Sequence, residues 1–332
     1  AEWNAIAGAM AWARDRFEVL MTTEMVGGDP GANQPYGYVH FDGDRGIVAA
    51  RNPFVVPGRL ELELSSLDGL AADAESLVLE RVYPTRWISA QLYRAGEILV
   101  LPLEGYETAI YELYPLESAT EPLLAGVVFE TASTQGKAES LRILRSNGVA
   151  RFLDPGVVKK VSVDGRKSSV ERSELPAMDE QAGVGGIVPR ETQSGLELEF
   201  ELAEDTTATL AVLVRPERKN DGEHDPEVHV RLDGVDADTR EEVQAGTWSW
   251  SLVEVGPGRH SARIALSRTA DSPAWTGSVE AWLLLARRPQ AVEVRVVATG
   301  PAEAARPLPP RPWPAGELRS TIELGQARVD LP

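Results

Sequence analysis

The chain of 332 residues contains no cysteine. Disulfide bonds, thiolate metal ligands and cysteine nucleophiles are therefore excluded together. Long apolar runs are also absent, and none approaches the roughly 20 residues that a membrane-spanning helix needs. The first residues, Ala1-Glu2-Trp3, lack the basic region of a signal peptide, and the missing initiator Met suggests a processed chain or part of a longer one.

Basic residues are few in comparison with acidic ones. Lysine and arginine number 33 against 51 acidic residues, which gives a net charge of −18. Such a field repels phosphate backbones and anionic lipid surfaces, so neither nucleic acid nor a membrane is an expected partner. The compartment stays open, with an extracellular or periplasmic location in a bacterium favoured.

One helical pattern stands at the N-terminus. Residues 3–25 place bulky apolar side chains at three- and four-residue spacing, and the segment Gly27-Gly28-Asp29-Pro30-Gly31 ends the pattern. The apolar stripe of this expected helix needs a partner surface. Either the following strands supply that surface or another domain does.

From Tyr36 onward the periodicity changes to two, which predicts short strands separated by turns. The expected strands of the first half are Tyr38–Phe41, Gly46–Arg51, Arg59–Leu64, Leu77–Tyr83, Ile98–Leu103 and Thr108–Tyr114. Those of the second half are Leu196–Leu202, Thr207–Val214, Glu227–Leu232, Trp248–Val255, His260–Leu266, Gly277–Leu285 and Val292–Val297, with a last one at Ser320–Leu324 or Ala327–Leu331 that docks back onto a sheet.

These strands predict a mainly β protein with two antiparallel β-sandwich domains of jelly-roll type and one N-terminal α-helix. The expected divisions are a helix and turn at 1–30, a first sandwich at 31–116, an irregular β region and linker at 117–195, a second sandwich at 196–300 and a proline-rich tail at 301–332. Within the third division, Leu123–Glu130, Ser140–Leu144 and Val157–Val163 are candidate strands, whereas residues 167–186 are polar and then glycine-rich, which favours a linker or long loop.

No catalytic motif is present in the sequence. The Gly-x-Ser-x-Gly pattern of serine hydrolases is absent, and the four histidines show no spacing that indicates a triad. Paired carboxylates for glycoside hydrolysis cannot be tested by spacing, because 51 acidic residues always provide some pair.

Two acidic segments are candidate metal sites. In the first, Glu223 to His229, the ligand types include His224, Asp225, Glu227 and His229, and a strand at this point places Glu227 and His229 on one face. A solvated loop entering a strand is the favoured interpretation. In the second, Asp42 and Asp44 alternate as in a calcium loop, but a hairpin turn explains them without an ion. No cofactor is expected, and calcium is the alternative.

Tryptophans suggest a ligand class. Trp248 and Trp250 lie on one face of an expected strand, and Trp275 follows Ser272-Pro273-Ala274 on an expected loop. Planar aromatic rings stack on the apolar faces of sugars, so these three residues are candidates for binding a polysaccharide or oligosaccharide. Burial in the core is the competing interpretation, and it is preferred for Trp282.

Two segments, Tyr36–Pro53 with its Arg51-Asn52-Pro53 turn and Leu101–Leu113, resemble the β-sandwich that follows the catalytic barrel in α-galactosidase-like glycoside hydrolases. The resemblance covers roughly residues 1–116. It implies that the helix continues from an upstream catalytic barrel domain, and that the second sandwich is a carbohydrate-binding module. The catalytic carboxylates of that family lie upstream of such a helix, so none has a counterpart in this chain.

Three functions remain open. The leading one is a non-catalytic accessory region of a carbohydrate-active protein, with glycan binding by the second sandwich. A self-sufficient hydrolase with a cleft between the two domains is the second, and it would use the acidic and histidine residues at 223–229. The third is a structural or adhesive β-sandwich protein.

Overall fold

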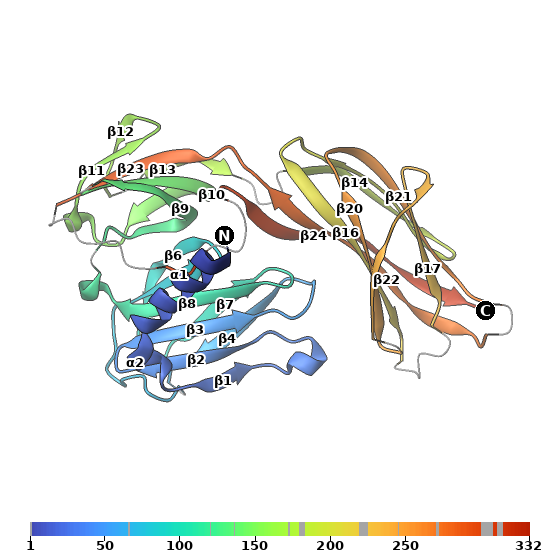
Figure 1. Cartoon of the computed structure of the whole chain (residues 1–332), viewed down its shortest axis with the longest axis horizontal. Coiled ribbons are helices and arrows are strands. Elements are labelled where there is room, and N and C mark those ends of the chain that lie inside the picture. Colours follow the sequence, from blue (N-terminus) through green and yellow to red (C-terminus); the bar gives the residue numbers. More distant parts are fainter. Residues whose placement is uncertain are drawn as a thin grey trace. The chain divides into compact units, whose positions relative to one another are not determined.

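The computed structural model describes residues 2–65, 67–119, 121–135, 137–171, 173–178, 183–218, 225–244, 246–269, 272–299, 308–310 and 315–332. The chain is mainly β, with antiparallel sheets and helices at the N-terminus, which confirms the predicted fold class (Figure 1). Two compact units are formed. Unit 1 comprises residues 1–180 and 289–317, and unit 2 comprises 181–288 and 318–332.

The N-terminal segment is not one helix. Helix α1 spans Glu2–Arg14, the short α2 spans Phe17–Leu20, and strand β1 follows at Glu24–Gly27. The predicted single helix over 3–25 is therefore wrong at its interruption before Phe17 and beyond Met21. Arg16 leaves the helical conformation between α1 and α2, and β1 is drawn into the sheet by pairing with the next strand. None of the described helices is long and apolar enough to cross a membrane.

Unit 1 continues with a series of short and then longer strands. They are β2 Tyr36–Asp42, β3 Arg45–Arg51, β4 Gly58–Glu63, β5 Leu77–Tyr83, β6 Arg86–Tyr93, β7 Ile98–Leu103, β8 Thr108–Pro115, β9 Leu124–Gln135, β10 Ala138–Phe152, β11 Val158–Val163, β12 Arg166–Ser168, β13 Ser173–Met178 and β23 Val292–Ala298. Three single-turn helices lie at Pro30–Ala32, Leu116–Ser118 and Pro155–Val157.

Most of these strands belong to one sheet, in the order β1-β2-β3-β8-β5-β6-β9-β10-β23-β11-β12, with β13 on β10 and with β4 and β7 forming a separate pair. Strand β5 is buried on both faces. Leu77 and Leu79 enter one hydrophobic core with β4 and β7, whereas Val78 enters another with β9 and β10. This explains why the sequence of β5 shows an apolar run rather than clean alternation.

Unit 2 is a sandwich of two five-stranded sheets. Its strands are β14 Val184–Thr192, β15 Gly195–Leu202, β16 Thr206–Pro216, β17 Glu227–Leu232, β18 Val235–Asp236, β19 Arg240–Gln244, β20 Trp248–Val255, β21 Gly258–Ser267, β22 Trp275–Arg287 and β24 Leu318–Leu331. The sheets run β14-β15-β21-β17-β18 and β19-β20-β16-β22-β24. Alternate residues of the strands, such as Leu196, Leu198 and Phe200, fill one core between the sheets.

The middle of the chain holds longer strands than its pattern predicts. Strands β9, β10 and β11 include most of the three candidate strands of this region, and β12, β13 and the start of β14 lie within or beside the expected linker. The two alternative C-terminal strands are one continuous strand, β24, and its docking onto β22 confirms the predicted return to a sheet. In the proline-rich tail, residues 301–307 and 311–314 lie outside the described residues.

Tyr111 on β8 gives a pH prediction for unit 1. Its ring is 1% exposed, its hydroxyl donates to the carbonyl of Pro102, and burial raises its pKa to about 12 against the opposing influence of Arg81. A raised tyrosine pKa stabilises the fold below the unfolded value near 10, and this contribution is lost as the pH rises toward 12. In the unchanged protein the free energy of unfolding should therefore fall by about 1.4 kcal/mol per pH unit in this interval. We expect Tyr111→Phe to lack this fall, which urea unfolding between pH 9 and 12 measures. Identical slopes in the two proteins would contradict this.

Candidate functional site

The three tryptophan candidates do not form an exposed platform. Trp250 is 2% exposed and Trp275 is 5% exposed, while Trp248 is half-buried. The expectation that Trp275 lies exposed on a loop is wrong, because β22 begins at this residue, pairs it with Leu331 and carries its ring into the core of unit 2. Trp282 is buried, as predicted. Sugar binding by Trp248, Trp250 and Trp275 stays a prediction, and of the three Trp248 alone is partly accessible.

The acidic and histidine segment is only partly described. His224 and Glu223 lie outside the described residues, and Asp225 accepts a hydrogen bond from the backbone of Gly246 at 2.7 Å. Glu227 and His229 share the outer face of β17, with Oε2 and Nε2 3.7 Å apart, and His229 also contacts the hydroxyl of Ser267. Within the described ranges no group of three or more His, Asp or Glu side chains could hold a metal ion.

Asp42 and Asp44 flank the tight turn between β2 and β3, and both are exposed. Gly43 takes a positive φ of 64° at the turn, and its backbone is bonded to Gly69 and Ala71. These backbone bonds hold the turn without an ion. The calcium alternative stays a prediction.

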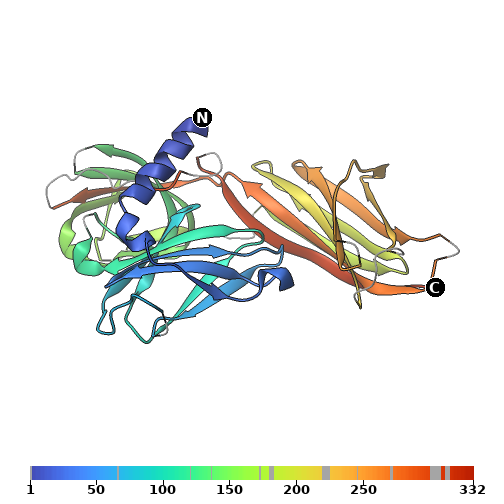
Figure 2. The same cartoon turned by 60° about the horizontal axis from the view of Figure 1, so that its bottom comes forward.

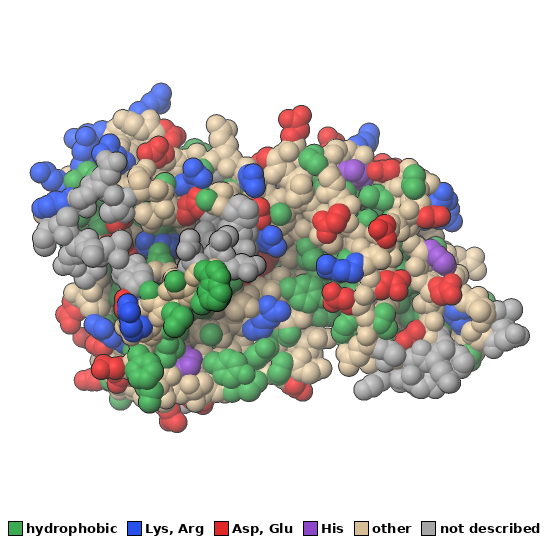
Figure 3. Space-filling model, in the orientation of Figure 1, with side chains coloured by type: hydrophobic (Ala, Val, Ile, Leu, Met, Phe, Trp, Pro, Cys, Tyr) green, Lys and Arg blue, Asp and Glu red, His purple; other side chains and the backbone are tan. Residues whose placement is uncertain are grey.

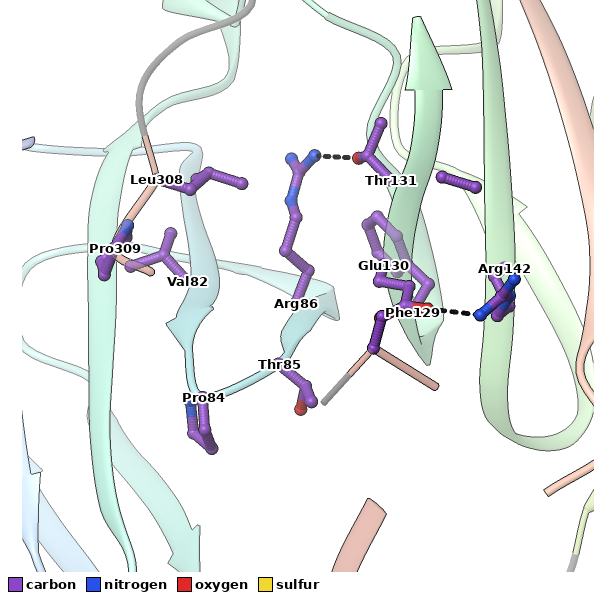
Figure 4. A pocket seen from close by; sticks show the side chains of 12 residues that line it. Val82, Pro84, Thr85, Arg86, Phe129, Glu130, Thr131, Arg142, Leu308 and Pro309 are labelled. Atoms are coloured by element: carbon purple, nitrogen blue, oxygen red, sulfur yellow. Dashed lines mark hydrogen bonds and ion pairs between the residues drawn. The ribbon is translucent and has the colours of Figure 1, made fainter. Parts of the chain in front are cut away.

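A cavity of about 370 Å³ opens in unit 1 among β5, β6, β9 and β10 (Figure 4). Arg86, Phe129, Glu130 and Arg142 line it, together with Leu308 and Pro309. The Arg86 guanidinium lies 5.1 Å from the centre of the Phe129 ring, and Arg142 donates to Glu130 at 3.2 Å. The cavity is therefore bounded by charged groups that already have close partners of opposite charge.

Arg86 belongs to a buried ionic network. Its Nε and Nη2 contact the carboxylate of Glu80 at 2.9 and 2.7 Å, and Nη2 also contacts Glu121 at 2.6 Å. Glu80 is 0% exposed and accepts a further bond from the Tyr114 hydroxyl at 2.6 Å. A fully buried carboxylate is tolerated in a protein only with such partners. The network thus lies against the hydrophobic core that contains Tyr114 and Phe129.

Burial, and then the nearby Glu121 carboxylate, raise the pKa of Glu139, while Arg86 opposes the change. A raised carboxyl pKa is a mark of catalytic acids. Glu139, however, lines neither the cavity around Arg86 nor the cavity beside the N-terminal helices.

A second cavity in unit 1, of about 330 Å³, lies beside the N-terminal helices and includes Arg16, Glu112 and Glu121. Glu112 accepts hydrogen bonds from the Trp12 indole at 2.8 Å and from Arg16 at 2.7 and 3.2 Å. The Arg16 guanidinium also lies over the Trp12 ring at 5.2 Å. These contacts anchor the end of α1 to the outer face of β8.

The rest of α1 and α2 presents an apolar surface to solvent. It consists of Trp3, Ile6, Met10, Phe17 and Met21, which are 49–81% exposed. Figure 2 shows α1 extending beyond the sheet, and in Figure 3 hydrophobic side chains gather over the helices and the neighbouring β1 and β2. There Met25 and Tyr38, opposite each other in the strand pair, are also about half exposed. We call these seven exposed side chains, five on the helices and two on β1 and β2, the apolar surface of unit 1.

Unit 2 carries a third cavity, of about 280 Å³, on the outer face of the sheet formed by β14, β15, β21 and β17. Its polar lining includes three arginines and two glutamates: Arg190, Arg231, Arg263, Glu197 and Glu199. Sequence reasoning did not single out these residues. Alternation places Glu197, Glu199, Arg231 and Arg263 on outer strand faces, whereas Arg190 lies in β14, which shows no alternation and was not predicted. The proximity of all five residues depends on which strands pair.

Comparison with protein-family models and with curated proteins finds no match. Among solved structures, the isomalto-dextranase of Arthrobacter globiformis complexed with panose matches 78% of this chain and 36% of its own, at 10% identity and a TM-score of 0.18. A GH86 protein in complex with neoagarooctaose matches 80% of this chain and 34% of its own, at 13% identity and a TM-score of 0.19.

An adhesin, CfaE of enterotoxigenic E. coli, matches 88% of this chain and 80% of its own, at 10% identity and a TM-score of 0.15. The chain thus spans about a third of the length of the two glycoside hydrolases. TM-scores this low establish no common fold and carry no conclusion on function. The more specific resemblance to α-galactosidases stays a prediction.

Proposed function

We propose that this chain is a non-catalytic accessory region of a carbohydrate-active protein, in which unit 1 docks against a catalytic domain and unit 2 contacts a glycan. The observation that carries the proposal is the apolar surface of unit 1. Monomeric proteins seldom expose a contiguous set of bulky apolar side chains, and such sets mark interaction sites. The sequence resemblance of residues 1–116 to a sandwich that follows a catalytic barrel supports the same role.

The way in which α1 is held also supports docking. Trp12 and Arg16 fix the helix to Glu112, so the apolar side chains of α1 are presented on an anchored element. The buried carboxylates Glu80 and Glu112 are each bound by an arginine, which compensates their buried charge rather than leaving an acid free for catalysis.

The proposal predicts an accessible, replaceable apolar surface. We expect the triple variant Trp3→Ser, Met10→Ser and Phe17→Ser to keep the melting temperature of unit 1 within a few degrees, because the three side chains are 63–81% exposed. Binding of a hydrophobic dye should fall. As a control, Val235→Ser with Val243→Ser, at two exposed positions of unit 2, should change dye binding less. A large loss of stability in the triple variant would show that these residues are packed.

The function itself is tested by two assays on the same chain. Affinity electrophoresis in gels that contain single polysaccharides should show retardation by at least one of them. Incubation with the same polysaccharides should release no reducing sugar. Release of reducing sugar by the chain alone would overturn the accessory role, and migration unaffected by every polysaccharide would overturn the glycan contact.

A further inference from the structure

A row of charged residues crosses all five strands of one sheet of unit 2, and its first four members line the cavity on the outer face. Strand register places Arg190 opposite Glu197, Glu197 opposite Arg263, Arg263 opposite Arg231 and Arg231 opposite Asp236. Directly opposed residues on one sheet face have Cβ atoms about 5 Å apart. The order is therefore Arg, Glu, Arg, Arg, Asp, with two arginines side by side.

Adjacent like charges are unfavourable unless a counter-charge lies between them. Arg263 is paired only loosely, since its Nε is 3.7 Å from the Glu197 carboxylate, beyond hydrogen-bonding distance. Arg190 makes no ion pair with any residue that the structure describes. Both guanidinium groups therefore hold N–H donors that are open to a ligand, and the Arg263 side chain is 62% exposed.

The far wall of the cavity is formed by a turn with several polar contacts. Arg231 contacts Asp236 at 3.1 Å and donates to the carbonyl of Gly234 at 2.5 Å, which fixes the turn between β17 and β18. Asp233 in the same turn accepts from the backbone N–H of Ser261 at 2.8 Å and contacts Nδ1 of His260 at 2.8 Å. Partial desolvation opposes ionisation of Asp233, but these two partners outweigh it and lower its pKa.

His260 faces acceptors through both ring nitrogens, with the carbonyl of Gly256 2.9 Å from Nε2. The pair of Asp233 and His260 thus holds Ser261 and the turn in place before a ligand arrives. Because this part of the cavity is ordered before binding, less conformational entropy of the protein is lost when a ligand binds.

The two cavities of unit 1 described above differ from this one in the charge compensation of their arginines. There Arg86 and Arg16 lie within 2.7 Å of a carboxylate oxygen, so their charges are compensated. In unit 2 the row leaves guanidinium groups open, although the whole chain carries a net charge of −18. Charge complementarity at this cavity therefore favours an anionic group, because arginine binds planar carboxylates and sulfate oxygens through two parallel N–H donors.

We propose that this cavity binds an acidic polysaccharide, with Arg263, Arg190 and Arg231 receiving a carboxylate or sulfate group on a sugar. This inference rests on the proposed glycan contact and names its chemistry. Glu197 and Glu199 are acceptors for neighbouring hydroxyl groups, and Val188, 56% exposed, offers an apolar edge to the ring. A volume of about 280 Å³ at the surface suits one charged sugar unit of a chain rather than an enclosed cofactor.

The test is affinity electrophoresis with three probes: polygalacturonate for carboxylate, dextran sulfate for sulfate, and neutral dextran. We expect retardation by at least one anionic probe and none by dextran, with affinity falling as salt rises. Retardation by polygalacturonate alone identifies a carboxylate ligand, and retardation by dextran sulfate alone identifies a sulfate ligand. The double variant Arg190→Gln with Arg263→Gln should weaken binding on the order of tenfold or more, as expected for lost charge-assisted hydrogen bonds.

Arg240→Gln is the matched control, because it removes one exposed arginine from the other sheet of unit 2 and should leave the affinity unchanged. The melting temperatures of all variants verify that they are folded. If the double variant bound an anionic probe as strongly as the unchanged chain does, the assignment of the ligand to this cavity would be overturned. Binding of dextran alone would overturn the anionic ligand and leave the glycan contact standing, whereas no binding to any polysaccharide would overturn both.

Discussion

Replacing Arg86 by methionine is expected to lower the free energy of unfolding of unit 1 by about 3–5 kcal/mol, because a buried carboxylate loses its cationic partner. Glu80 is 0% exposed, and Arg86 contacts it at 2.7–2.9 Å through two nitrogen atoms. The Tyr114 hydroxyl would remain as a hydrogen-bond donor, but a neutral donor does not offset the buried charge. Urea unfolding at pH 7, followed by circular dichroism, measures the loss.

Two further variants separate charge from packing. In the double variant Arg86→Met with Glu80→Gln the fully buried charge of Glu80 is gone, while Glu121 still loses its contact with Arg86, so part of the lost stability should return. Arg94→Met breaks an exposed pair with Glu97 and should change stability by about 0.5 kcal/mol or less. If Arg86→Met alone were as mild as Arg94→Met, the network would not be a determinant of stability in unit 1.

Replacing Phe200 by alanine is expected to destabilise unit 2 by about 3–5 kcal/mol, the usual cost of removing a buried aromatic ring. Phe200 is 1% exposed in the core between the two sheets. Its ring also lies 5.6 Å from that of His260, which binds Asp233 beside the arginine cavity. The void left in the core by the missing ring should therefore also weaken the contacts that hold the turn between β17 and β18.

Hydrogen exchange of peptides from β15 and β21 assigns this loss to unit 2, because the two units need not unfold in one transition. Phe200→Leu keeps most of the apolar volume and should cost clearly less than the alanine variant. Val243→Ala, at a position 58% exposed, should be nearly neutral. Equal losses for the alanine and leucine variants would contradict a packing role and indicate instead a requirement for the aromatic ring.

Strand positions were largely predictable because alternation is a local property. The pattern of residues 196–202 places leucines and Phe200 inward and Glu197 and Glu199 outward, and the structure has them so. The exceptions are instructive. The stretch after residue 16 looks helical by spacing, yet Glu24–Gly27 forms β1, because pairing with β2 satisfies its backbone and outweighs local preference.

The candidate site was less predictable than the strands. Trp275 follows a proline-containing turn in the sequence, and only its pairing with the C-terminal strand shows that it enters the core. Arg190, Arg263 and Arg231 lie on three different strands, and nothing local to any of them indicates the other two. Their row exists because β21 lies between β15 and β17, a neighbour relation that no single segment encodes.

The sequence by itself therefore determined the mainly β class, the inward and outward faces of most strands and the absence of cysteine chemistry. Tertiary structure decided which strands are neighbours, which tryptophans are buried, which carboxylates are paired with arginine, and where open guanidinium groups meet. The physical reason is the same throughout. Periodicity depends on residues a few positions apart, whereas strand order and register depend on hydrogen bonds and packing between segments far apart in the chain.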